Sequence, residues 1–121
     1  PAARAVALMT CDVVLLHGLW MNRYAMLPLA RRLAAAGFTP HALTYRSFAC
    51  GLSEHVARVA ELVARIGAKP VHVVAHSMGG VVTAAYLAQA PRGTAHRVVL
   101  LGSPVAACHA GRTLAGHPAW G

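Results

Sequence analysis

Acidic charge is scarce in this sequence: its 121 residues include three Asp or Glu against eleven Lys or Arg. The resulting formal charge of +8 would suit a nucleic-acid or anionic partner if the cations formed a patch. Ten of the eleven cations are Arg, spread from Arg4 to Arg112, and only Arg31 and Arg32 are adjacent. We therefore attribute the excess to a composition bias and do not expect nucleic-acid binding.

Cysteine is also rare, and long apolar runs are absent. Cys11, Cys50 and Cys108 are odd in number and widely spaced, unlike a disulfide framework or a zinc site with close pairs, so we expect free, mostly buried thiols. No apolar run approaches the ~18 residues of a membrane span, and no signal peptide is recognisable. We expect no transmembrane segment and a cytoplasmic location. Secretion stays open because the sequence starts at Pro1 and the N-terminus can be incomplete.

Apolar residues make up 57% of the chain, and its mean hydropathy is +0.52. That is enough to bury a core, which excludes a disordered tail, and the eleven glycines show no collagen period. The composition predicts one globular domain. The length is near the lower end of what a sheet with helices on both faces requires.

Short apolar runs alternate with helical patterns along the chain. The runs are continuous, as in strands that are covered on both faces, while apolar residues recur at helical spacing between them. The pattern predicts strands at 13–17, 41–45, 71–75 and 97–101, and helices at 26–36, 53–66 (with Ser53 as N-cap) and 78–90. This alternation indicates an α/β fold with a parallel sheet and helices on both faces. We expect the spatial order of strands to be His41, Val13, Val71, Val98.

The third predicted strand runs through Ala75-His76-Ser77-Met78-Gly79-Gly80 directly into a helix. This is the pattern of a nucleophile elbow, in which a sharp strand-to-helix turn exposes a serine hydroxyl at the sheet edge. Small residues two before and two after the serine are needed because the two backbones approach closely. Ala75 and Gly79 occupy these positions.

At these residues the sequence resembles the α/β-hydrolase family, and the Ala-x-Ser-x-Gly form looks like that of some bacterial lipases. His17-Gly18-Leu19-Trp20 is similar to the family's His-Gly oxyanion loop. The run 98–104 is similar to the strand that follows the nucleophile helix. The resemblance covers essentially the whole chain, with three motifs in the family's order.

The resemblance implies acyl transfer to a serine, with a small-molecule or lipid ester as substrate and no cofactor or metal. Ser77 would be the nucleophile, and the backbone N–H groups of Leu19 and Met78 would form the oxyanion hole. The supporting residues would be His17, Gly18, His76 and Gly79, and the acyl side of the pocket would be lined by Trp20, Met21 and Asn22.

The sequence departs from the family after the serine. There the family's chain order is serine, acid, histidine, but no Asp or Glu follows Ser77, and the acids Asp12, Glu54 and Glu61 all precede it. His96, His109 and His117 follow the serine without lying on a loop after a further strand. We therefore interpret residues 1–121 as the N-terminal part of one hydrolase domain, an incomplete fold that ends before the acid and the histidine of the triad. Alone, it should be nearly inactive.

The α/β pattern leaves three alternatives. A thioesterase or acyltransferase of the same fold would use the same serine, and a noncatalytic hydrolase-like domain would serve binding only. A dinucleotide-binding protein fits poorly, because no Gly-x-Gly-x-x-Gly follows the first strand. The oligomeric state is not indicated. Among the histidines outside the motifs, we expect His72 to be a core or edge residue of its strand. We expect the others at the surface: His41, His55, His96, His109 and His117.

Overall fold

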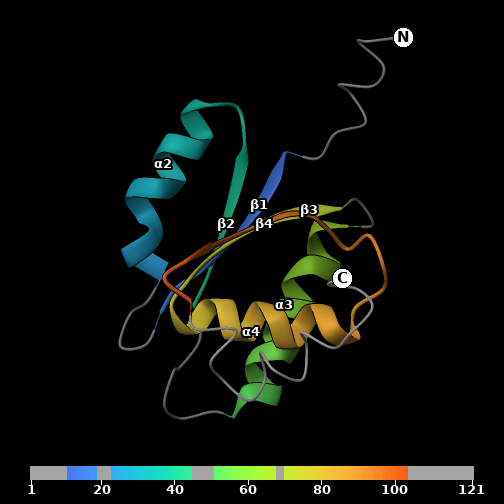
Figure 1. Cartoon of the computed structure of the whole chain (residues 1–121). Coiled ribbons are helices and arrows are strands. Elements are labelled where there is room, and N and C mark those ends of the chain that lie inside the picture. The colour runs from blue at the N-terminus through green and yellow to red at the C-terminus, as the bar shows by residue number, and fades with distance from the viewer. Residues whose placement is uncertain (1–10, 19–22, 45–50, 68–69, 104–121) are drawn as a thin grey trace, which may run out of the picture.

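The structure is a computed structural model that describes residues 11–18, 23–44, 51–67 and 70–103 (Figure 1). Strands and helices alternate along the chain, which confirms the predicted α/β class. In order they are β1 (Asp12–Leu16), η1 (Arg23–Met26), α2 (Leu27–Ala35), β2 (Thr39–Leu43), α3 (Leu52–Ile66), β3 (Val71–His76), α4 (Met78–Gln89) and β4 (Ala95–Leu101).

The four strands form one parallel sheet in the order β2-β1-β3-β4, as the sequence predicts. Val14 of β1 lies opposite His41 on one side and Val73 on the other. Both central strands are rich in valine, and Val13 through Leu16 are all at most 2% exposed. Such a run suits a strand with side chains buried on both faces.

Helices cover both faces of the sheet, but unequally (Figure 1). On one face α3 and α4 pack side by side, and their Val56, Val59 and Val82 form a core with Val14 and Val73. On the other face lie η1 and α2, whose Met26 and Ala30 pack against Val13 and Leu15 of β1. Alternate residues of each strand therefore belong to different cores.

Most predicted boundaries differ from the observed ones by one or two residues, and the starts of three elements show the largest or clearest differences. Helix α3 starts at Leu52 with Gly51 as its N-cap, so Ser53 is not the cap. Strand β2 starts at Thr39 because the Thr39 N–H donates to the Cys11 carbonyl (2.7 Å) and extends the pairing; Pro40 is tolerated because β2 is an edge strand. Strand β4 likewise begins at Ala95 rather than at Arg97.

Cys11 is a free thiol, as predicted, but it is exposed rather than buried. It directly precedes β1, at the amino end of the strand. Cys50 and Cys108 lie outside the described residues.

Candidate active site

Ser77 forms the turn between β3 and α4 and has an unusual backbone conformation. Its φ of 52° and ψ of −120° make it the one residue other than glycine with positive φ in the part of the chain that the structure describes. The Ser77 N–H donates to the Leu101 carbonyl of β4 (2.9 Å), and the Ser77 carbonyl accepts from Gly80 (3.0 Å). A residue other than glycine in this backbone conformation costs about 1–3 kcal/mol, so the surrounding hydrogen bonds must hold Ser77 in it.

Gly79 is required by the approach of α4 to the end of β1. A Cβ at Gly79 would lie 2.6 Å from the Leu16 carbonyl oxygen and 2.9 Å from that of His17. A Cβ at Gly80 would overlap the Ser103 side chain, which follows β4. The two glycines let the first turn of α4 sit against both neighbouring strands.

Gly18 brings the segment after β1 beside the serine. A Cβ at Gly18 would be 3.0 Å from the Ser77 Cβ and 2.9 Å from the His76 Nδ1, both closer than ordinary contacts. His17 is fully buried, and its Nδ1 lies 2.9 Å from the Gly18 carbonyl oxygen, to which it can donate. These contacts place the His17-Gly18 motif and the elbow at one site.

Met78 is the first residue of α4, where backbone N–H groups have no acceptor within the helix and carry the positive end of its dipole. Leu19, the other predicted oxyanion residue, lies outside the described residues, as do Trp20, Met21 and Asn22. His76 is partly buried, and its Nδ1 has no hydrogen-bond partner within the described part of the chain. That nitrogen faces Gly18, as the short distance to a Cβ there shows.

The acids of the chain are not gathered around the serine. Asp12 lies at the amino end of β1, whereas Ser77 follows the carboxyl end of β3, so the two residues lie at opposite ends of the parallel strands. The Asp12 Oδ1 is 2.9 Å from the His41 Nε2. Glu54 and Glu61 are exposed on α3. The His41 side chain is 28% exposed on the edge strand β2, so the expectation of a surface residue is met only in part.

His55 is the histidine that sequence reasoning misplaced most. It was expected at the surface but is 3% exposed, because it lies one turn before Val59 on the buried stripe of α3. Burial lowers its pKa from the usual 6.5, with smaller contributions in the same direction from Arg58 and His17, while Glu54 opposes the shift. The i+4 spacing to Val59 was the signal that could have revealed this burial.

The other two described histidines are as expected. His96 is exposed on β4, and its ring centroid lies 5.3 Å from that of His72. His72 sits partly buried within β3 and also makes an edge contact with Phe38 (5.9 Å). His109 and His117 are outside the described residues.

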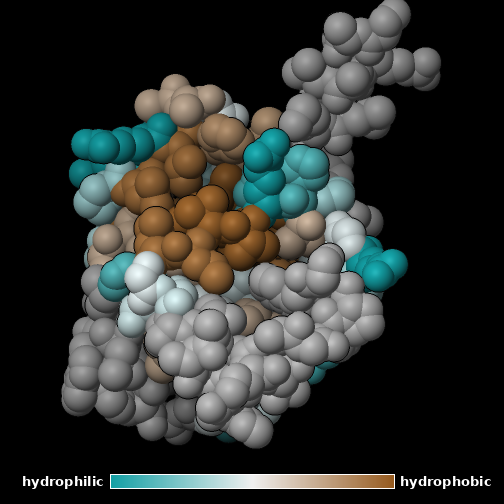
Figure 2. Space-filling view, in the orientation of Figure 1, coloured by the Kyte–Doolittle hydropathy of each residue, from teal (hydrophilic) through white to brown (hydrophobic). Residues whose placement is uncertain are grey.

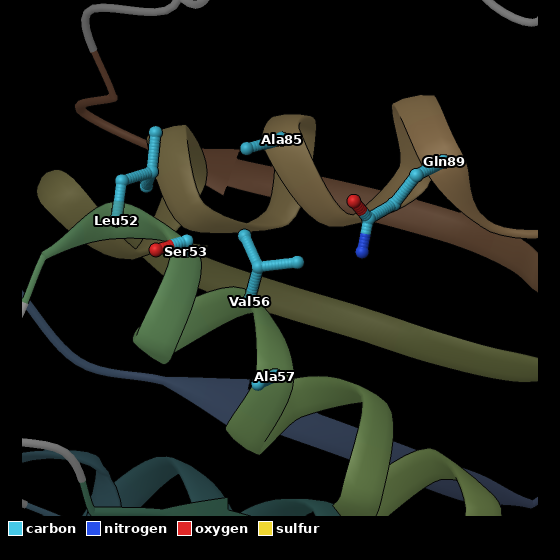
Figure 3. A pocket seen from close by; sticks show the side chains of 6 residues that line it. All are labelled: Leu52, Ser53, Val56, Ala57, Ala85 and Gln89. Carbon is cyan, nitrogen blue, oxygen red and sulfur yellow. The ribbon is translucent and has the colours of Figure 1, made fainter.

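A shallow groove of about 450 Å³ lies between α3 and α4, away from Ser77 (Figure 3). Val56 and Gln89 point into it from the two helices, and Leu52 and Ser53 lie at one end. Its lining offers no nucleophile paired with a base, so the elbow remains the candidate site.

A parallel sheet that carries a serine at a strained strand-to-helix turn, beside a His-Gly segment, defines the class of α/β hydrolases. The comparison with protein families agrees: a model described as the alpha/beta hydrolase family matches residues 13–121. The chain therefore belongs to the alpha/beta hydrolase family, which supports hydrolase chemistry on a small-molecule substrate. No curated protein matches it. Within the described ranges, none of the helices is long and apolar enough to cross a membrane.

Proposed function

We propose that this chain provides the nucleophile half of a serine hydrolase of carboxylic esters, similar to lipases and carboxylesterases. Ser77 attacks the ester carbonyl carbon, the alcohol leaves, and water then hydrolyses the acyl-serine. The observation that carries this assignment is the positive φ of Ser77. A binding domain would have no need of that strain, because an alanine or glycine turn would join β3 and α4 at lower cost.

The same geometry supports an oxyanion hole. Met78 supplies an N–H group at the amino end of α4, and the family resemblance assigns the second to Leu19, the residue after Gly18 in the sequence. Each such donor contributes about 3 kcal/mol to transition-state stabilisation. His17 fixes the start of that segment through the Gly18 carbonyl, while Gly79 lets α4 approach β1. His76 is partly buried, with its Nδ1 on the Gly18 side, and is a supporting residue rather than the base.

The general base and its acid come from polypeptide outside these 121 residues. No acidic residue follows Ser77 in these 121 residues, and Asp12 lies at the amino end of its strand, away from Ser77. In this proposal residues 1–121 are the N-terminal part of one hydrolase domain. A thioesterase or acyltransferase would use the same serine and oxyanion donors, and only the acyl donor or acceptor would differ.

Hydrolysis of a short-chain aryl ester tests the proposal. We would assay the 121-residue chain, the same chain continued through the residues that its gene encodes after Gly121, and Ser77→Ala in the longer chain. The longer chain should turn over the ester, the short one should retain a remnant, and Ser77→Ala should reduce kcat by at least ~10³-fold.

Ser53→Ala provides a matched control, because Ser53 is an exposed serine on α3, and its kcat should be unchanged. Equal activity of the short and the longer chain would show that a base lies within these 121 residues. It would overturn the proposal that the base and its acid lie outside them. An aryl thioester turned over much faster than the matching ester would favour the thioesterase alternative.

A further inference from the structure

Two histidine rings are in contact at the amino end of the sheet. Their centroids, in His72 of β3 and His96 of β4, lie 5.3 Å apart, with an interplanar angle of 68°. His72 precedes Val74 by two residues and therefore points to the same face, the one that carries α2. Figure 2 shows a group of hydrophilic side chains near the start of β1, at this end of the sheet, next to a hydrophobic patch. Ser77 follows the opposite end of β3, so the histidine pair is separate from the candidate active site.

An irregularity in the pairing of β3 with β4 coincides with the histidine pair. Val71 lies opposite Ala95, whereas His72 lies opposite Arg97, so β4 has one residue more than β3 at this point, and that residue is His96. Two residues of β4, His96 and Arg97, therefore share His72 as their neighbour. Such bulges re-aim side chains and are frequent beside functional sites.

The His72 ring is positioned by its neighbours. It is partly buried, and its centroid lies 5.9 Å from that of Phe38 in a second edge contact, with an interplanar angle of 80°. His96 is exposed on β4. One ring is thus held by packing while the other is open to solvent beside it. A ligand that binds both loses less free energy to ordering than it would with two mobile side chains.

The spacing of the two rings suits one shared metal ion. Imidazole binds Zn²⁺, Cu²⁺ and Ni²⁺ through a single ring nitrogen, at about 2.0–2.1 Å for zinc. Two imidazoles on one ion at a tetrahedral angle therefore have centroids about 5 Å apart, close to the observed 5.3 Å. Metal-bound histidines normally keep their other ring nitrogen in a hydrogen bond, so one nitrogen of each ring is enough. Within the described ranges no three His, Cys, Asp or Glu are grouped to hold a metal, so water completes the coordination of this pair.

We propose that His72 and His96 form a two-histidine site for a divalent transition-metal ion, with Cu²⁺ bound more tightly than Ni²⁺ or Zn²⁺. The ion joins β3 to β4, an edge strand of the described sheet, and so stabilises the folded form that binds it. Arg97 is exposed opposite His72, and its positive charge weakens the binding of a cation there. The site is independent of the proposed function, because it lies at the other end of the strands from Ser77 and takes no part in ester hydrolysis.

Titration of the 121-residue chain with Cu²⁺ tests the site. All three cysteines would be replaced by serine, because thiols also bind copper. Calorimetry measures the Kd, and electron paramagnetic resonance counts the imidazole nitrogens on the ion. His96→Asn and His72→Asn should each weaken the tightest site at least ~10-fold and leave one nitrogen in place of two. His41→Asn is the matched control, because His41 pairs with Asp12, and its Kd should change less than about twofold.

Stoichiometry shows whether the two rings share one ion. The tightest class of site should take up one equivalent of Cu²⁺ in the parent chain. Two equivalents in the parent, falling to one at unchanged affinity in each single variant, would mean that each ring binds its own ion and would overturn the shared site. An unchanged Kd in His96→Asn, whose exposed side chain can be replaced without disturbing the core, would overturn it as well.

Arg97→Glu tests the site in the opposite direction. It removes the repelling charge opposite His72 and offers a carboxylate as a third ligand, so binding of Cu²⁺ should tighten at least ~10-fold. Arg65→Glu, at an exposed position of α3, changes the net charge equally and should alter the Kd less than about twofold. Equal tightening in both variants would show that net charge alone governs binding. That result, or no tightening in Arg97→Glu, would place the ion elsewhere and overturn the proposal.

Discussion

The two faces of the sheet are built from the same strands but are covered differently. On one face two helices enclose Val14, Leu16 and Val73, while on the other η1 and α2 enclose Val13 and Leu15 and leave β4 bare. The candidate active site belongs to the well-covered face, because α4 begins at Ser77 and packs there. The difference teaches that the serine is positioned on the face where two helices pack, whereas Val99 and Leu101 of β4 stay exposed on the face that carries α2.

Leu15 and Leu16 allow the most direct test of this comparison, because they are consecutive in β1, both fully buried, and point to opposite faces. Truncation to alanine should lower the unfolding free energy by about 2–5 kcal/mol at either position. Leu16→Ala should cost more, since the two packed helices leave less room for the cavity to relax. Urea unfolding checks this, and an equal or larger loss for Leu15→Ala would contradict the unequal packing.

Gly79→Ala tests the contact between α4 and β1. The added Cβ would meet the Leu16 carbonyl oxygen, a backbone atom that cannot move aside without shifting β1. We expect a loss of about 1–3 kcal/mol in unfolding free energy. Gly51→Ser is the control, because nothing lies within 4 Å of a Cβ there and serine is also a favoured N-cap, so its effect should stay within about 0.5 kcal/mol. Similar values for the two variants would argue against close packing at the elbow.

Ser77→Gly tests the backbone strain at the elbow. Glycine adopts positive φ without a Cβ penalty, so Ser77→Gly should be more stable than Ser77→Ala by about 1 kcal/mol, although both lack the hydroxyl. Thermal unfolding of the two variants side by side measures the difference. Should alanine prove as stable as glycine, the turn would not be strained, and the main support for Ser77 as nucleophile would be lost.

His55 gives the smallest expected effect, a pH dependence of stability. Burial lowers its pKa in the folded protein, so the unfolded chain binds the proton more readily. The unfolding free energy should therefore decline as the pH falls below about 6.5 and be unaffected by this residue above it. His55→Leu should flatten the decline in urea titrations between pH 7.5 and 5.5. An unchanged slope would assign the effect to another group.

Much of this molecule could be predicted from local sequence patterns. The continuous apolar runs predicted the four strands, since a strand buried on both faces needs apolar residues at every position. The helices between them predicted that the strands are parallel. The elbow at Ser77 was visible as a serine between a strand and a pair of glycines. Predicted boundaries were less accurate where a tertiary hydrogen bond, such as that from Thr39 to Cys11, extends an element beyond its pattern.

The sequence alone determined the fold class, the places of the strands along the chain and the position of the serine, because these depend on residue type and spacing along the chain. Tertiary structure decided what depends on distances between segments. The approach of Gly18 to Ser77, the burial of His55 and the exposure of Val99 arise because strands far apart in the sequence lie side by side. No local pattern records which neighbour a side chain meets across a sheet or whether a helix covers it, since both follow from how the elements pack.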